Sequence, residues 1–138
     1  MKLSEDFGYA WATGLHRNTR SSGLIPVQTA GIEKIPVIKA LSSTVKPSRL
    51  VRFDEWNSAL DCQDAVLHFY TSDKRMRHVL ANPPKWTYRL SAARAVISPD
   101  LSLFQDYPPS LRILHTRINR AAAAHWQSHG VEVIANVR

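Results

Sequence analysis

The last third of the chain constrains the fold most, because it reads as a strand, a long helix and a second strand. A short apolar run over Ala95–Ser98 precedes a loop and a helix predicted over Pro109–Ser128. Apolar side chains recur along that helix at helical spacing, and Gly130 stands where a left-handed residue commonly ends a helix. Val131–Val137 then returns as an apolar strand. A strand, crossover helix and strand is the unit that builds a parallel sheet.

The middle of the chain repeats this alternation of strands and helices. Ala65–Tyr70 is a compact apolar run, which is typical of a strand buried on both faces, and Arg49–Phe53 alternates polar with apolar residues. Helices are expected over Lys74–Ala81 and from Pro84 to about Ala93. The predicted fold class is therefore α/β, a mostly parallel sheet with right-handed crossover helices.

We expect this sheet to be incomplete and to form part of a larger α/β domain. Val133–Val137 is as apolar as an interior parallel strand, but no helix follows it to cover its second face. A bare face or edge beside Val131–Arg138 is expected to drive homodimerisation, partner binding or aggregation.

Two regions are expected along the chain. Residues 1–34 mix aromatic residues with glycines and are predicted to be a partly flexible N-terminal arm. Residues 35–138 are predicted to be the α/β domain, which begins with a short extended segment over Ile35–Lys39. The length of 138 residues suits one domain with a hydrophobic core.

Composition excludes several classes of protein. Cys62 is the single cysteine, so neither an internal disulfide nor a cysteine-cluster metal site is expected. No apolar run approaches the roughly 18 residues of a membrane span, and the N-terminus lacks the apolar core of a signal peptide. We therefore expect a cytoplasmic protein.

The net charge of +7, from 18 Lys and Arg against 11 Asp and Glu, favours a polyanionic partner such as nucleic acid. Divided at residue 60, the chain carries a net +3 and +4 in its two parts, so a merely solubilising surface remains the alternative. Three arginines of the long helix lie off its apolar stripe. These candidate nucleic-acid contacts are Arg112, Arg117 and Arg120.

Polar residues follow three of the predicted strands, and ligands of parallel sheets gather at the carboxyl ends of the strands. The candidate ligand-binding residues are Tyr70, Asp73 and Ser98, and the candidate catalytic residues are Asp100, Asn136 and Arg138. A carboxylate, an amide and a guanidinium could hold a polar or anionic ligand or supply acid and base groups. The alternative is that Asp73 and Asp100 only cap or turn the chain.

Metal and cofactor signals are weak. His125 and His129 have the i, i+4 spacing of a helical metal pair, but Trp126 stands where a zincin has glutamate. Helix-end cations explain this pair better. No P-loop, glycine-rich dinucleotide fingerprint or Gly-x-Ser-x-Gly elbow is present. We expect neither a metal nor a cofactor.

Several short motifs together resemble a known family. They are Ile-Pro-Val-Ile-Lys at 35–39, His-Phe-Tyr at 68–70, Asn-Pro at 82–83, Ile-Ser-Pro-Asp-Leu-Ser-Leu at 97–103 and Val-Ile-Ala-Asn-Val-Arg at 133–138. The chain resembles the bacterial and phage domain of unknown function number four-four-one-seven over roughly residues 33–138. That resemblance implies a role in phages, plasmids or related mobile elements and carries no established activity. Members usually continue past Asn-Val-Arg, so the resemblance also implies a C-terminal truncation.

Three functions remain open at this point. The first is an accessory binding or interaction module of a mobile element, whose partner is nucleic acid or a replication, transfer or defence protein. The second is an α/β enzyme that acts on a small polar or anionic substrate at the carboxyl ends of the strands. The third is an inactive truncated fragment.

Overall fold

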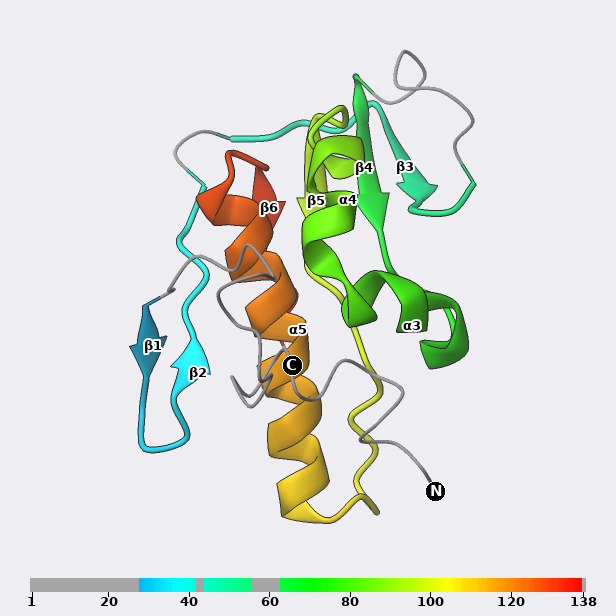
Figure 1. The fold of residues 1–138 in the computed structure, drawn as a ribbon. Helices are drawn as coiled ribbons and strands as arrows, with labels where there is room; N and C mark the ends of the chain where they lie inside the picture. The colour runs from blue at the N-terminus through cyan, green and yellow to red at the C-terminus, as the bar shows by residue number, and fades with distance from the viewer. Residues whose placement is uncertain (1–27, 42–43, 56–62, 138) are drawn as a thin grey trace.

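A parallel sheet of four short strands forms the centre of the fold (Figure 1). The structure is a computed structural model that describes residues 28–41, 44–55 and 63–137. The strands are β3 (Arg49–Arg52), β4 (Ala65–His68), β5 (Ala95–Ile97) and β6 (Val133–Ile134). They lie in the order β3-β4-β5-β6, and each neighbouring pair is parallel. The predicted α/β class and the parallel pairing of the three apolar runs are confirmed.

The helices follow from this strand order. They are α3 (Asp73–Ala81), α4 (Pro83–Leu90) and α5 (Pro109–Ser128). When consecutive parallel strands are neighbours and every crossover is right-handed, the crossover helices all lie on one face of the sheet. Figure 1 shows α4 and α5 in front of the strands. The predicted bounds of α5 agree with the structure, whereas α4 ends three residues before the expected Ala93.

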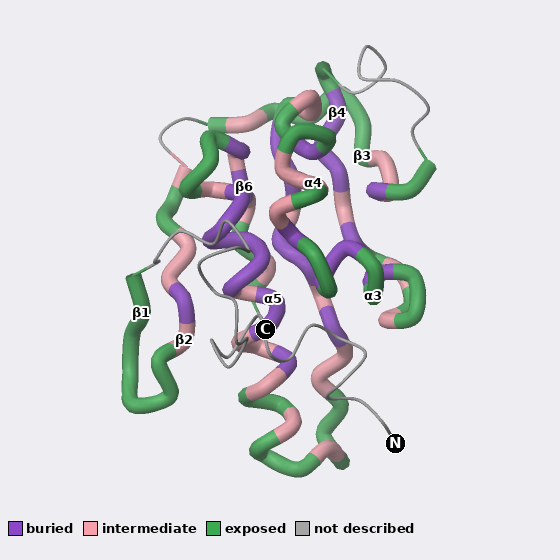
Figure 2. Tube along the Cα trace, viewed as in Figure 1, coloured by how far each residue is buried: buried purple, intermediate pink, exposed green. Residues whose placement is uncertain are grey.

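One hydrophobic core joins the sheet to these helices (Figure 2). Phe69 stacks between Phe53 and Trp126, with ring centroids 4.6 and 5.6 Å apart. Alanines 121–124 are buried, so their small side chains let α5 approach the sheet closely, as the sequence predicts. The strands and the residues directly after them contribute the core side chains Phe53, Leu67, Phe69, Val96 and Val133, and the partly buried Val51 packs against this core.

A short hairpin lies beside α5. Strand β1 (Thr29–Ala30) pairs antiparallel with β2 (Ile35–Pro36). The backbone of Lys39, after β2, is held by Gln127 of α5: the Lys39 amide donates to Oε1 at 2.8 Å, and Nε2 donates to the Lys39 carbonyl at 2.9 Å. The hairpin crosses the expected boundary between residues 34 and 35, while residues 1–27 of the predicted arm lie outside the described residues.

The end of α5 is fixed by its backbone. Gly130 has φ of 85°, and its amide donates to the Gln127 carbonyl at 3.1 Å. The Val131 amide donates to the Trp126 carbonyl at 3.1 Å. These two hydrogen bonds form a Schellman motif that turns the chain into β6. The sequence prediction for Gly130 is confirmed.

Candidate functional site

The carboxyl edge of the sheet gathers most of the polar side chains that the sequence singles out. The register of the parallel pairs places Arg52 opposite His68 and Ile97 opposite Ile134. The residues that follow all four strands therefore lie at this edge of the sheet. The polar groups form two clusters, one after β3 and β4 and one after β5 and β6. Arg138 lies outside the described residues.

A small cavity, called here the edge cavity, lies after β5 and β6. Its volume is about 40 Å³. Its lining is Ser98, Pro99, Asp100, Leu103, Thr116, Asn119, Arg120 and Asn136. Since one water needs roughly 10–15 Å³ of such space, the cavity has room for a few waters or one small polar group. It brings together four predicted residues from three elements: Ser98, Asp100, Arg120 and Asn136.

Hydrogen bonds fix the loop that walls this cavity. Asn119 of α5 accepts the Leu101 amide at 3.0 Å, and His115 Nδ1 lies 2.7 Å from the Ser102 carbonyl. The Asp73 carboxylate accepts both the amide and the hydroxyl of Ser102, each at 3.1 Å. Asp73, a predicted ligand residue, is not part of the lining of the edge cavity and instead anchors Ser102 of this loop. A loop held at three points presents its side chains with little reorganisation on binding.

Ser98, which lines the edge cavity, also links the end of β5 to β6 and the segment after it. The backbone amide of Asn136 donates to the Ser98 hydroxyl at 2.8 Å, and the Ser98 amide donates to the Ile134 carbonyl at 2.8 Å. Ser98 is buried, and its hydroxyl oxygen is the acceptor in this contact. The Asn136 side chain remains part of the cavity wall.

A larger opening, called here the α5 groove, adjoins the edge cavity because Leu103 and Thr116 line both. It has a volume of about 460 Å³, within the usual range of about 300–1,000 Å³ for small-molecule sites. Its lining is Glu33, Ile35, Leu103, Pro109, Arg112, Ile113 and Thr116. The hairpin, the loop after β5 and α5 therefore enclose it together.

The three predicted arginines of α5 have different surroundings. Arg112 lines the α5 groove and Arg120 lines the edge cavity. Arg117 is held by the hairpin, since its Nη1 donates to the Glu33 carbonyl at 2.6 Å. Two of these cations thus line two adjacent openings, and the third contacts the hairpin that lines the α5 groove.

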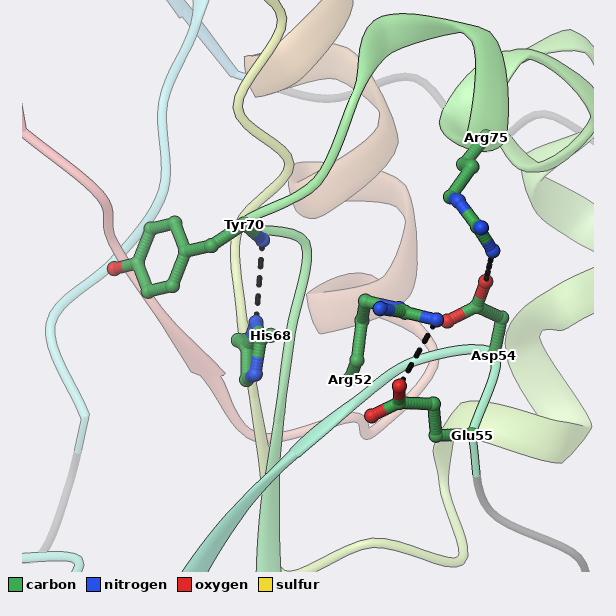
Figure 3. A network of polar contacts seen from close by, with 6 residues as sticks. All are labelled: Arg52, Asp54, Glu55, His68, Tyr70 and Arg75. Atoms are coloured by element: carbon green, nitrogen blue, oxygen red, sulfur yellow. Dashed lines mark hydrogen bonds and ion pairs between the residues drawn. The ribbon is translucent and has the colours of Figure 1, made fainter.

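The second polar cluster lies after β3 and β4 (Figure 3), and the sequence reasoning missed most of it. Asp54 accepts hydrogen bonds from Arg52 and, at 3.1 Å, from Arg75 of α3. Partial burial acts to raise the pKa of Asp54, but the hydrogen bonds from both guanidinium groups hold that pKa below its usual value. Arg52 also pairs with Glu55 at 3.0 Å. The sequence did contain one signal for this cluster. Polar and apolar residues alternate over Arg49–Phe53, and this alternation points Arg52 away from the core.

His68 and Tyr70 complete this cluster. The Tyr70 amide donates to His68 Nδ1 at 3.2 Å, and the two rings stack with centroids 5.2 Å apart. Burial lowers the pKa of His68, so its ring is neutral at pH 7. With Nδ1 accepting, the proton resides on Nε2. Tyr70, a predicted ligand residue, is exposed and caps this histidine (Figure 3).

Metal ligation finds no support in the described part of the chain. No group of three or more His, Cys, Asp and Glu side chains there could hold a metal ion. His125 and His129 face each other with centroids 4.2 Å apart, and His129 Nδ1 lies 2.8 Å from the His125 carbonyl. None of the described helices has the length and apolar character needed to cross a membrane.

Comparison with known proteins assigns the family. Residues 27–138 match the family described as domain of unknown function (DUF4417), and the chain belongs to that family. The chain is similar to the Gene 1 protein of Mycobacterium phage D29, with 35% identity over 69 residues. It is also similar to the Gene 1 protein of Mycobacterium phage L5, with 32% identity over 69 residues.

These phage relatives are longer proteins. The matched segment is 50% of this chain, but 26% of the D29 protein and 30% of the L5 protein. No solved structure matches the chain. The comparisons therefore give a phage-associated family of unknown function, and the chemistry has to be argued from the site.

Proposed function

We propose that this chain is a binding module of a phage or related mobile element, and that it binds a small anionic organic molecule. The observation that carries the proposal is the adjacency of the α5 groove and the edge cavity, which share Leu103 and Thr116 in their linings. The groove has the volume of a ligand body, and the edge cavity has the volume of one polar head group. The relatives in two mycobacteriophages support the mobile-element setting.

The chemistry of the lining indicates the ligand class. Ile35, Leu103 and Ile113 supply apolar contact to the ligand body. In the edge cavity, the Arg120 guanidinium can pair with an anionic head group such as phosphate or carboxylate. The Asn136 side chain, which also lines that cavity, adds an amide donor and an acceptor.

Binding of adenosine monophosphate and of citrate, followed by thermal unfolding and calorimetric titration, tests this proposal. At least one probe is expected to raise the melting temperature. Arg120→Gln should abolish that rise, because the guanidinium is the cation of the head-group cavity. Arg94→Gln, which removes an exposed cation outside both openings, is the matched control and should retain it. No shift with either probe, or equal loss in both variants, would contradict the proposal.

An enzyme that acts on the same ligand is the second candidate. Asp100 lines the edge cavity with Arg120 and Asn136, so a carboxylate lies within the same small space as the proposed head group. Such a carboxylate can serve as a general acid or base. Chromatography of a bound probe after long incubation with the protein distinguishes the binding module from the enzyme, because only an enzyme converts the probe to a product.

A further inference from the structure

The helices α3 and α4 carry much of the net charge of the chain. They contain five Lys and Arg against one acid, Asp73, which is a net +4 of the total +7, and one of these cations, Arg75, pairs with Asp54. The Asp73 carboxylate is already engaged by Ser102. Lys74, Arg77, Lys85 and Arg89 are all exposed on this surface. The charge is therefore concentrated on one pair of helices.

Aromatic rings lie among these cations. Tyr88 is 91% exposed, which leaves both faces of its ring open to solvent. Trp86 is half-buried and carries the Arg89 guanidinium 5.2 Å from its ring centroid. His78 of α3 lies 5.2 Å from the same ring, so it joins the outer faces of the two helices. We call this set, from Lys74 to Arg89, the α3–α4 surface.

We propose that the α3–α4 surface binds single-stranded nucleic acid. Proteins that bind single strands combine cations that follow the phosphates with aromatic rings on which bases stack. Lys74 and Lys85 supply exposed charge, and Tyr88 supplies an open ring. Exposure of the apolar ring of a tyrosine to water is unfavourable. A nucleobase is a flat partner of matching size that can cover such a ring. This site is distinct from the α5 groove, so it stands independently of the proposed small ligand.

The rival surface for a polyanion is the set of α5 arginines that the sequence suggested. Two of them line the α5 groove and the edge cavity, and Arg117 contacts the hairpin backbone. Lys74, Arg77, Lys85 and Arg89 of α3 and α4 are instead exposed. The geometry therefore favours the α3–α4 surface for an extended, flexible strand.

Fluorescence anisotropy with a labelled mixed-sequence single-stranded DNA, at two salt concentrations, tests the proposal. Lys74→Gln/Lys85→Gln is expected to weaken binding about tenfold and to reduce the salt slope by about 1.4, at roughly 0.7 per phosphate contact. Lys39→Gln/Lys46→Gln removes the same charge elsewhere and should change neither. Tyr88→Ala is expected to weaken binding about tenfold through lost stacking, with an unchanged salt slope.

Three further binding measurements test whether the partner of the α3–α4 surface is single-stranded nucleic acid. Double-stranded DNA of the same sequence should bind more weakly than the single strand and be insensitive to Tyr88→Ala. Vesicles with anionic lipid should not compete with the oligonucleotide. An Arg112→Gln/Arg120→Gln variant should bind as the wild type does. The proposal is overturned if the wild type does not bind, if the two lysine pairs have equal effects, or if duplex or vesicles bind better. Far-UV circular dichroism of each variant verifies folding.

Discussion

His125 is the residue whose burial has the clearest thermodynamic consequence. It lies in the last turn of α5 with 2% of its surface exposed. Burial and the nearby His129 lower the pKa of His125 to about 4, from 6.5. Because the unfolded chain takes up a proton between these two values while the folded chain does not, stability is lost as the pH falls through this window.

The prediction at this position is that unfolding becomes easier between pH 7 and pH 5. The His125 contribution is at most about 2 kcal/mol over that interval, from a shift of roughly 1.4 kcal/mol per pH unit. His125→Leu should remove this part of the pH dependence, because leucine fills a similar volume and does not titrate. Chemical denaturation at several pH values measures the difference. An equal pH dependence in the variant would contradict it.

At the scale of the elements, the structure agrees best with predictions from long periodic segments. The bounds of α5 could be predicted because its apolar spacing, two opening prolines and closing glycine all act locally. The β1–β2 hairpin could not, because two-residue strands are too short to show alternation. Its position depends instead on contacts with α5 such as Gln127 to Lys39.

Gly130 gives a prediction for the turn between α5 and β6. Its φ of 85° is costly for residues with a Cβ atom, by about 1–2 kcal/mol. A Cβ at this position would meet nothing within 4 Å, so the cost is conformational and not steric with neighbours. Gly130→Ala should therefore lower the free energy of unfolding by about 1 kcal/mol. Gly130→Asn should lower it less, because asparagine tolerates this region better. Equal losses in denaturant titrations of the two variants would show that another effect dominates.

At the scale of the whole molecule, strand-end reasoning named three of the residues that line the edge cavity. It named Ser98, Asp100 and Asn136 because polar residues after parallel strands meet at one edge. It could not place Asn119 and Thr116 in the same cavity, because that depends on the rotation of α5 and on the loop that His115 and Asn119 anchor.

The α3–α4 surface could have been predicted from the sequence. Dividing the charge at residue 60 averaged the five cations of α3 and α4 with acids outside those helices. A count over this one helix pair would have revealed its net charge of +4. The exposure of Tyr88 and the stacking of Trp86 with His78 and Arg89 required coordinates, because they depend on how α4 packs against α3.

The position of β6 leads to a prediction about assembly. β6 is an edge strand in the described part of the sheet, and no described strand pairs with its outer side. The Glu132 and Ile134 carbonyls accept amides of β5 residues, so the backbone of Val133 and Ala135 faces outward. Val137 beyond it is 78% exposed. An edge strand with apolar side chains that no described strand pairs with is a template for a second strand.

We therefore expect the purified chain to dimerise as its concentration rises, with β6 in the interface. Ala135→Lys should shift the equilibrium toward monomer, because a lysine on an exposed edge opposes strand pairing. Phe104→Lys places the same charge at an exposed apolar residue in the loop before α5 and should leave the equilibrium unchanged. Size-exclusion chromatography with light scattering over a wide concentration range measures the equilibrium. A monomer at every concentration, or a dimer that tolerates Ala135→Lys as well as it tolerates Phe104→Lys, would exclude β6 from the interface.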